Sequence, residues 1–271
     1  MVDTKDERVD MRGVMLVVQS PDRVSEVIRR TLQFTIALLR ASLADWRSSL
    51  ITLFVPLLIL SMFKILERSA APGGTSRLNL VFPSVVGLTA MLGGQSVMTC
   101  LISWRQQGFF QRLACAPVPL GALVVGAGLT QAVISTIQAV VVIVFGGLAM
   151  GLSVDPVSAS AATGILILCA VCFIAFGMLV ASLSNKAENG GAIFMFTLLP
   201  MYFLGGEWFN NTLPPALKAV AMWLPTTLSN AMLNPLMLPG AAQSGLLKPL
   251  SGLLIYIFTF AALAAWRFRW E

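Results

Sequence analysis

Charge almost disappears from this chain after residue 47. Of its 30 Lys, Arg, Asp and Glu residues, 15 lie in residues 1–47, which leaves 15 for the remaining 224 positions. Soluble proteins carry about 25% charged residues, whereas this sequence carries 11% and is 57% hydrophobic. So few charges do not cover the surface of a soluble fold, and a chain this apolar does not stay disordered in water. The sequence therefore predicts an all-α integral membrane protein.

Six uncharged runs follow residue 47. A helix needs roughly 20 apolar residues to cross a bilayer. The shortest run, 48–63, can still cross the membrane, because the helix can continue to Lys64, whose long side chain reaches the headgroups. The longest run, 120–154, exceeds one span, and its glycines at 146, 147 and 151 indicate where the helix ends. We expect a membrane domain over residues 48–271 with six spans, at about 48–66, 80–103, 120–148, 158–184, 189–206 and 249–268.

Positive charge is divided unequally between the two sides of these spans. Six spans place both termini on one side, and that side then holds 13 Lys and Arg residues while the other holds five. The cytoplasmic side of a membrane protein carries the excess of positive charge. We therefore expect both termini in the cytoplasm, with a tail over residues 1–22.

Residues 23–47 have the pattern of an amphipathic helix. Val24, Ile28, Leu32 and Ile36 recur at helical spacing, with arginines on the other faces. Because the segment leads directly into the first span, we favour a helix that lies in the cytoplasmic membrane interface. The alternative is a soluble helix packed on a partner domain.

The cytoplasmic segment between the second and third spans, residues 104–117, is also amphipathic. Its two charges are arginines, and its large apolar side chains lie on a separate face of a helix: Phe109, Phe110 and Leu113. Such a segment suits insertion into a groove on a cytoplasmic partner. A plain interfacial connector fits the residues equally well.

The external segment before the last span, residues 207–240, is too apolar for a free loop and too rich in proline for one span. We expect two short helices in it, one beginning near Pro214 and one over about 226–233. Helices of this length enter the outer leaflet without crossing it, and irregular backbone at that depth needs shielding by protein. The segment is therefore predicted to be a re-entrant hairpin.

The order of these parts resembles the permease subunits of type-2 ABC exporters. Members of that family carry Arg-Glu-Arg-Gly-x-x-Glu-Arg-Leu-x-x-x-Pro in the loop after the second span. The acidic positions of the motif are Gln106 and Gln111 in this chain. In size and general sequence character the chain is most similar to the daunorubicin-resistance permeases of actinobacteria. The positions that match the loop motif are Arg105, Gly108, Arg112, Leu113 and Pro117.

The resemblance implies a division of labour. Two permeases, identical or homologous, would assemble in a bacterial plasma membrane, and two copies of a separate ABC ATPase would dock beneath them. The loop at 104–117 would be the coupling helix that seats in the ATPase, with Phe109 and Phe110 among its contacts. ATP and Mg²⁺ would bind on the ATPase, and this chain would hold no cofactor. Because Gln106 and Gln111 replace the acidic residues of the motif, the sequence leaves open whether coupling to the ATPase is weakened.

Polar side chains inside the predicted spans are candidates for the substrate pathway. Gln131, Ser135 and Gln138 share one face of the third span, and Gln95 and Thr99 lie one turn apart on the second. The alternative role for each is a hydrogen bond that holds neighbouring helices together. An uncharged path favours an uncharged or amphipathic cargo, such as a drug, a polyketide or a lipid.

Two residues at the predicted external mouth, Glu207 and Trp208, are candidates for a gate. The carboxylate and the indole are equally suited to anchoring the hairpin at the lipid headgroups. The sequence leaves both roles open.

Missing motifs narrow the function classes. The chain has no histidine and no Gly-x-x-x-x-Gly-Lys-Ser/Thr loop, so it is not expected to bind a metal or hydrolyse ATP itself. No basic patch with interleaved aromatics suggests nucleic acid. Cys169 and Cys172 form a C-x-x-C within an apolar run, where cysteine usually acts as a small apolar side chain. The remaining alternatives are an ion-coupled carrier, which needs buried charges, a lipid-modifying enzyme and a polysaccharide or glycolipid export permease.

Overall fold

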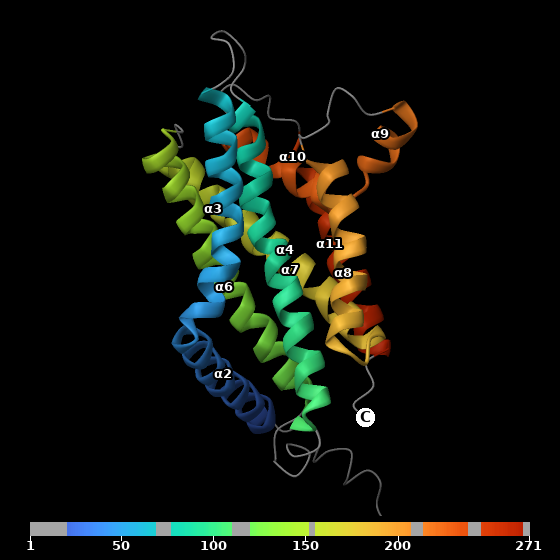
Figure 1. Cartoon of the computed structure of the whole chain (residues 1–271). Coiled ribbons are helices and arrows are strands. Elements are labelled where there is room, and N and C mark those ends of the chain that lie inside the picture. The colour runs from blue at the N-terminus through green and yellow to red at the C-terminus, as the bar shows by residue number, and fades with distance from the viewer. Residues whose placement is uncertain are drawn as a thin grey trace, which may run out of the picture.

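The computed structural model describes residues 21–68, 77–109, 120–151, 155–206, 214–237 and 245–267. All regular structure in these ranges is helical, which confirms the all-α class for this part of the chain. Figure 1 shows the long helices side by side in one bundle, with α2 at one end and α9 and α10 at the other. The helices are α2 (Pro21–Ala44), α3 (Trp46–Arg68), α4 (Arg77–Gln106), α6 (Leu120–Met150), α7 (Pro156–Leu183), α8 (Ala187–Gly205), α9 (Pro215–Ala221), α10 (Pro225–Met237) and α11 (Leu247–Arg267).

Five of these helices are long and apolar enough to cross a membrane: α3, α4, α6, α7 and α11. The chain is therefore a multi-pass membrane protein. The predicted fifth span corresponds to α8, whose 19 residues extend for about 28 Å. α8 is not among the five, and its first turn holds Glu188 and Asn189. Figure 1 shows α8 beside α4 in the bundle.

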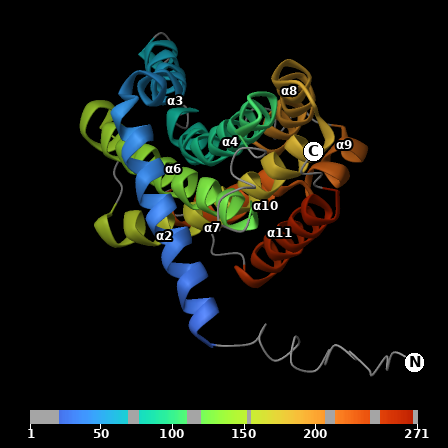
Figure 2. The ribbon, with the colours of Figure 1, turned by 90° about the horizontal axis from the view of Figure 1, so that it is seen from below.

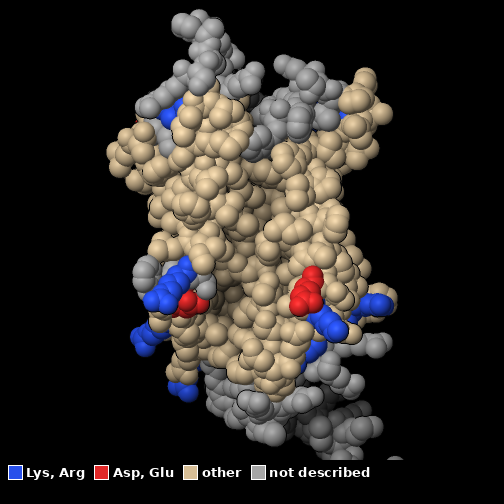
Figure 3. Space-filling model, in the orientation of Figure 1, with Lys and Arg blue, Asp and Glu red and all other residues tan. Residues whose placement is uncertain are grey.

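On one face of the described part of the protein, charged side chains lie toward the two ends of the bundle. On the face seen in Figure 3, a broad uncharged band separates Lys and Arg side chains at one end from mixed charges near the other. This distribution is expected of a protein whose middle lies in hydrocarbon. The exposed surfaces of α3 and α11 are accordingly apolar, with Phe54 and Ile51 on α3 and Ile255 and Phe258 on α11.

Each predicted span coincides with one helix, but most of the helices are longer than predicted. The second span was expected over 80–103, whereas α4 starts at Arg77 and ends at Gln106. Charged end residues remain helical because the backbone hydrogen bonds continue into the interface, where long side chains reach water. The third predicted span, α6, runs through Gly146 and Gly147 to Met150, so the helix end falls at the last of the three glycines that were expected to mark it. Gly151 ends the helix with φ 75°.

The centre of the bundle is the crossing of α4 and α7, which lie in the middle of the view in Figure 2. Gly94 of α4 and Gly177 of α7 bring the two backbones into contact. A Cβ on Gly94 would clash with the Phe173 carbonyl oxygen, and a Cβ on Gly177 would clash with the Gly94 carbonyl oxygen. Small residues permit this close approach between membrane helices. The sequence analysis did not identify either glycine.

α2 crosses the bundle obliquely and packs on α6 (Figure 2). α2 covers most of the segment 23–47, over which a helix was predicted, and a break at Asp45 separates it from α3. Gly126 of α6 leaves room for Phe34, and the Thr130 hydroxyl donates to the Thr35 carbonyl oxygen at 3.3 Å. α2 also presents an exposed apolar stripe: Ile28, Leu32, Ile36 and Leu43. This stripe is the surface that an interfacial helix needs.

The external region expected over 207–240 contains two short helices in its described part, residues 214–237. α9 begins at Pro215, as predicted, and is mostly exposed. α10 covers the predicted 226–233 and continues to Met237. It is held at the end of α8, because Thr226 donates to the Met201 carbonyl oxygen at 2.6 Å and Asn230 to that of Gly205 at 2.8 Å. The Gly205 carbonyl group lies at the end of α8, where a helix leaves carbonyl groups without a backbone partner.

Candidate translocation and coupling sites

A groove runs along α4 on one face of the molecule. Figure 3 shows this face hollowed along its middle, and in the same orientation Figure 1 shows α4 there with α3 and α8 on either side. Thr99 is exposed and Gln95 and Ser96 are half-buried, and Thr99 lies about one turn beyond the other two along the helix. We call this surface the α4 groove. Gln95 and Thr99, the residues that were predicted from the second span, belong to the helix that forms this groove.

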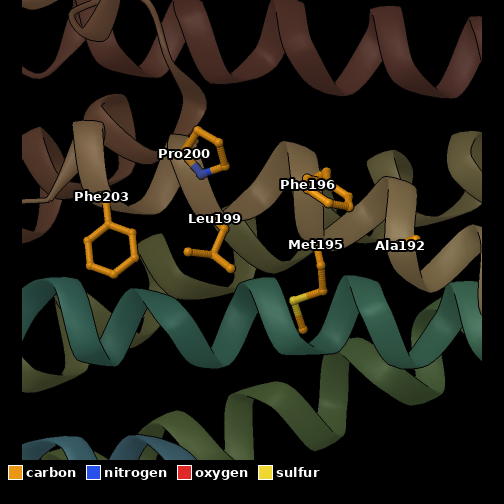
Figure 4. Close-up of a pocket in the computed structure, with 6 residues that line it drawn as sticks. All are labelled: Ala192, Met195, Phe196, Leu199, Pro200 and Phe203. Atoms are coloured by element: carbon orange, nitrogen blue, oxygen red, sulfur yellow. The ribbon is translucent and has the colours of Figure 1, made fainter.

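The α8 side of the groove is apolar. A pocket of about 470 Å³ lies along this helix, and its described lining residues all belong to α8. In Figure 4 the side chains of Met195, Leu199 and Phe203 point toward α4. Phe196 is among the most exposed large apolar side chains of the protein, at 81%. The complete lining is Ala192, Met195, Phe196, Leu199, Pro200 and Phe203.

The three polar residues predicted on the third span have different surroundings in α6. Gln138 is buried, and its amide nitrogen donates to the Ser49 carbonyl oxygen at 3.2 Å and to Thr52 Oγ1 at 2.8 Å. Ser135 is buried against Gly93 of α4. Gln131 is half-buried. Gln138 therefore links α6 to α3, which is the structural role weighed for it in the sequence.

The hydrogen bonds from Gln138 of α6 to α3 can be tested by mutation. Replacing Gln138 with leucine removes both hydrogen bonds and is expected to reduce the free energy of unfolding by about 1–3 kcal/mol. The unfolding temperature of the purified protein should fall by several degrees, as roughly 2–4 °C corresponds to each kcal/mol in a chain of this size.

Thr136→Val is the matched control, because the Thr136 hydroxyl bonds only to the Ala132 carbonyl oxygen of its own helix. Equal unfolding temperatures for the two variants would contradict the proposed link.

Gln131 and Gln138 meet again in a cavity of about 160 Å³ between α6, α4, α3 and the end of α2. We call it the polar cavity, because seven of its eight lining residues carry a polar side chain. Five of these polar residues were not predicted from the sequence, because Ser, Thr and Asp residues at these positions form no recognisable pattern. The lining is Ser42, Asp45, Ser49, Thr52, Ser96, Gln131, Ile134 and Gln138.

The end of α4 that leads into the predicted coupling loop is attached to α7. Nη1 of Arg105 donates to the carbonyl oxygens of Ala181 at 3.3 Å and Ser184 at 3.2 Å. These carbonyl groups lie in the last turn of α7 and just after it. A cation is favoured at a helix C-terminus, where the backbone carbonyl groups carry partial negative charge. Arg105 thus connects the start of the loop to the end of a buried helix.

The chain reverses direction directly after Arg105. Gly108 has φ 65°, and its N–H donates to the Arg105 carbonyl oxygen at 3.1 Å. A left-handed conformation of this kind favours glycine. The indole of Trp104 packs on Phe109 with ring centroids 5.2 Å apart. The other predicted coupling residues lie outside the described part of the chain, as do the predicted gate residues: Phe110, Arg112, Leu113, Pro117, Glu207 and Trp208.

Within the described residues, no group of three His, Cys, Asp or Glu side chains is positioned to hold a metal ion. Cys169 and Cys172 are both buried in α7 as free thiols.

Comparison with known protein families finds one match. Residues 32–238 match the family model described as ABC-2 type transporter. The match begins within α2 and ends directly after α10, so it includes the α4 groove, the polar cavity and the coupling loop. No curated protein matches the sequence at a significant level.

Proposed function

The chain belongs to the family of ABC-2 type transporters, and we propose that it is the membrane permease of an ATP-driven exporter. The observation that carries this proposal is the family match, which spans most of the chain. Membership of the family implies a membrane permease that works with an ABC ATPase supplied by another chain. The protein would thus act as a transport subunit and not as an enzyme.

The proposed topology has six spans, with α8 as the fifth. Its length of 19 residues approaches the roughly 30 Å of a bilayer's hydrocarbon core, and its position in the bundle supports the assignment (Figure 1). Both termini would then face the cytoplasm of a bacterial cell, because that side carries 13 of the 18 Lys and Arg residues. The segment over 207–240 would be the external re-entrant hairpin.

Coupling to the ATPase would occur where α4 ends. Arg105, Gly108 and Phe109 begin a segment that reverses direction at the cytoplasmic end of the bundle, and Phe110, Arg112, Leu113 and Pro117 continue it. Two ATPase subunits, with ATP and Mg²⁺ bound, would move this segment. The hydrogen bonds from Arg105 to α7 support the proposal, because they provide a route for that movement into the bundle.

The α4 groove would line the cargo pathway, facing a second permease. Gln95 and Thr99 give the groove polar contacts, and the apolar side of α8 suits a hydrophobic or amphipathic cargo. A drug, polyketide or lipid fits these surfaces, as the resemblance to the daunorubicin-resistance permeases implies. Glu207 and Trp208 would form the external gate.

The test is reconstitution of the purified chain in vesicles, with and without the ABC ATPase that co-purifies from its native membrane. Export of a fluorescent amphiphile should require the ATPase and ATP and should stop with vanadate. Export by the lone chain, driven by a proton or sodium gradient, would contradict the proposal and favour an ion-coupled carrier.

A further inference from the structure

The polar cavity has more hydrogen-bonding capacity than the protein itself uses. Both N–H groups of the Gln138 amide are occupied by Ser49 and Thr52, and the Ser96 hydroxyl donates to the Leu92 carbonyl oxygen. The half-buried amide of Gln131 has no hydrogen-bond partner among the described residues. A polar group in such surroundings needs water or a ligand, because leaving it without a partner costs free energy.

The composition of the lining selects for one kind of ligand chemistry. Hydroxyl groups from Ser42, Ser49, Thr52 and Ser96 face amide groups from Gln131 and Gln138, and both kinds of group donate and accept hydrogen bonds. Asp45 is the only charged residue of the lining, and its carboxylate disfavours an anionic ligand. The cavity therefore matches an uncharged group with several hydroxyls.

Apolar surface adjoins the polar cavity on two of its helices. Leu43 of α2 and Leu50 of α3 are each about half exposed, and each follows a lining serine in the chain, Ser42 or Ser49. A ligand that places a polar group in the cavity can therefore keep an apolar body in contact with these side chains and with lipid.

We propose that the polar cavity binds the uncharged, hydroxyl-bearing head group of an amphiphile while the apolar body of that amphiphile stays on the lipid-facing surface. Because Ser96 of the cavity lining lies on α4, the helix that forms the α4 groove, the site adjoins the proposed cargo pathway. The role of this site as a place where cargo enters from the membrane rests on the proposed function. The binding itself does not depend on an ATPase.

The experiment uses the full chain in phosphatidylcholine nanodiscs and two photoreactive probes. The first is a dodecyl glucoside with a diazirine on the sugar, and the second is a dodecyl phosphodiester with the same group. The glucoside is expected to crosslink to peptides containing residues 42–52 and 131–138, at lower concentration than the phosphodiester. If the natural ligand is a membrane lipid, an uncharged glycolipid added to the nanodiscs should displace the probe. If the natural ligand is a drug, a glycosylated drug should displace it.

Gln131→Leu is the informative variant. Because this amide holds no described part of the protein in place, the change should leave the unfolding temperature unaltered while raising the half-saturating glucoside concentration about tenfold. Ser96→Leu, which narrows the cavity from the opposite wall, should have a similar effect. Gln33→Leu makes the same amide-to-aliphatic change at an exposed site on α2 and should bind the probe as the native protein does.

Two results would overturn the inference. One is unchanged half-saturation in both Gln131→Leu and Ser96→Leu, and the other is tighter labelling of the same peptides by the phosphodiester. If export requires the ATPase but the labelling pattern is absent, the proposed binding site is wrong and the proposed function still holds. If the expected labelling occurs but ATP-dependent export does not, the binding site is supported and the proposed function is wrong.

Discussion

Replacing Gly177 with alanine is expected to lower the unfolding temperature by about 6–12 °C, and replacing it with valine to prevent folding. The added Cβ would clash with the Gly94 carbonyl oxygen of α4. This neighbour is backbone inside a helix and has no rotamer to change, so α4 and α7 must move apart along their whole crossing. Overpacking of a core costs about 1–3 kcal/mol and sometimes more, and we expect the upper end, about 3 kcal/mol, for alanine. That loss corresponds to the stated change in unfolding temperature.

Gly164→Ala is the control within the same helix. A Cβ at Gly164 meets nothing within 4 Å, and alanine is favoured over glycine in a helix by about 0.5–1 kcal/mol. This variant should therefore be as stable as the native protein or slightly more so. Thermal unfolding and size-exclusion profiles of the purified variants measure the difference. If Gly177→Ala were as stable as Gly164→Ala, the close crossing of α4 and α7 would be wrong.

Replacing Arg105 with methionine is expected to reduce ATP-dependent export at least tenfold in the reconstituted complex. Methionine retains an unbranched apolar stem and loses both hydrogen bonds to the end of α7. Hydrogen bonds from a charged group contribute about 1.5–3 kcal/mol each. The loss would free the α7 end from α4, and movement of the coupling loop would then no longer reach the bundle. The ATPase should continue to bind and hydrolyse ATP.

The accompanying structural measurement is amide hydrogen exchange over residues 181–186, which should become faster in Arg105→Met. Arg267→Met is the matched control, because it removes an exposed positive charge from the last turn of α11. It should leave both export and exchange near their native values. A variant that exchanges faster at 181–186 but exports normally would limit Arg105 to stabilising the end of α7.

Local chemistry explains how much of the fold the sequence predicted. Every predicted span coincides with a helix because the signal is the length of an uncharged run, which depends on no other part of the chain. The short external helices were also predictable, since Pro215 and Pro225 each occupy a helix start. Helix ends were predicted less well, because charged residues such as Arg77 continue a helix beyond its apolar part.

The candidate sites were predicted only in part. Helical periodicity correctly placed Gln95 and Thr99 on one side of α4, and it grouped Gln131 with Gln138. It did not reveal that Gln138 bonds to α3, 86 and 89 residues earlier in the chain, or that Arg105 reaches carbonyl groups 76 and 79 residues later.

The sequence by itself determined that this protein is a bundle of membrane-spanning helices with an amphipathic helix before them, because those properties follow from hydropathy along the chain. Only the tertiary structure decided which helices meet. Membrane helices are apolar on all sides, so their sequence carries little information about which face turns toward a neighbour. Contact depends on complementary shape, such as Gly94 against Gly177, and on polar groups that find partners across the bundle. The polar cavity arises in the same way, from single polar residues on four helices that become a site only where those helices converge.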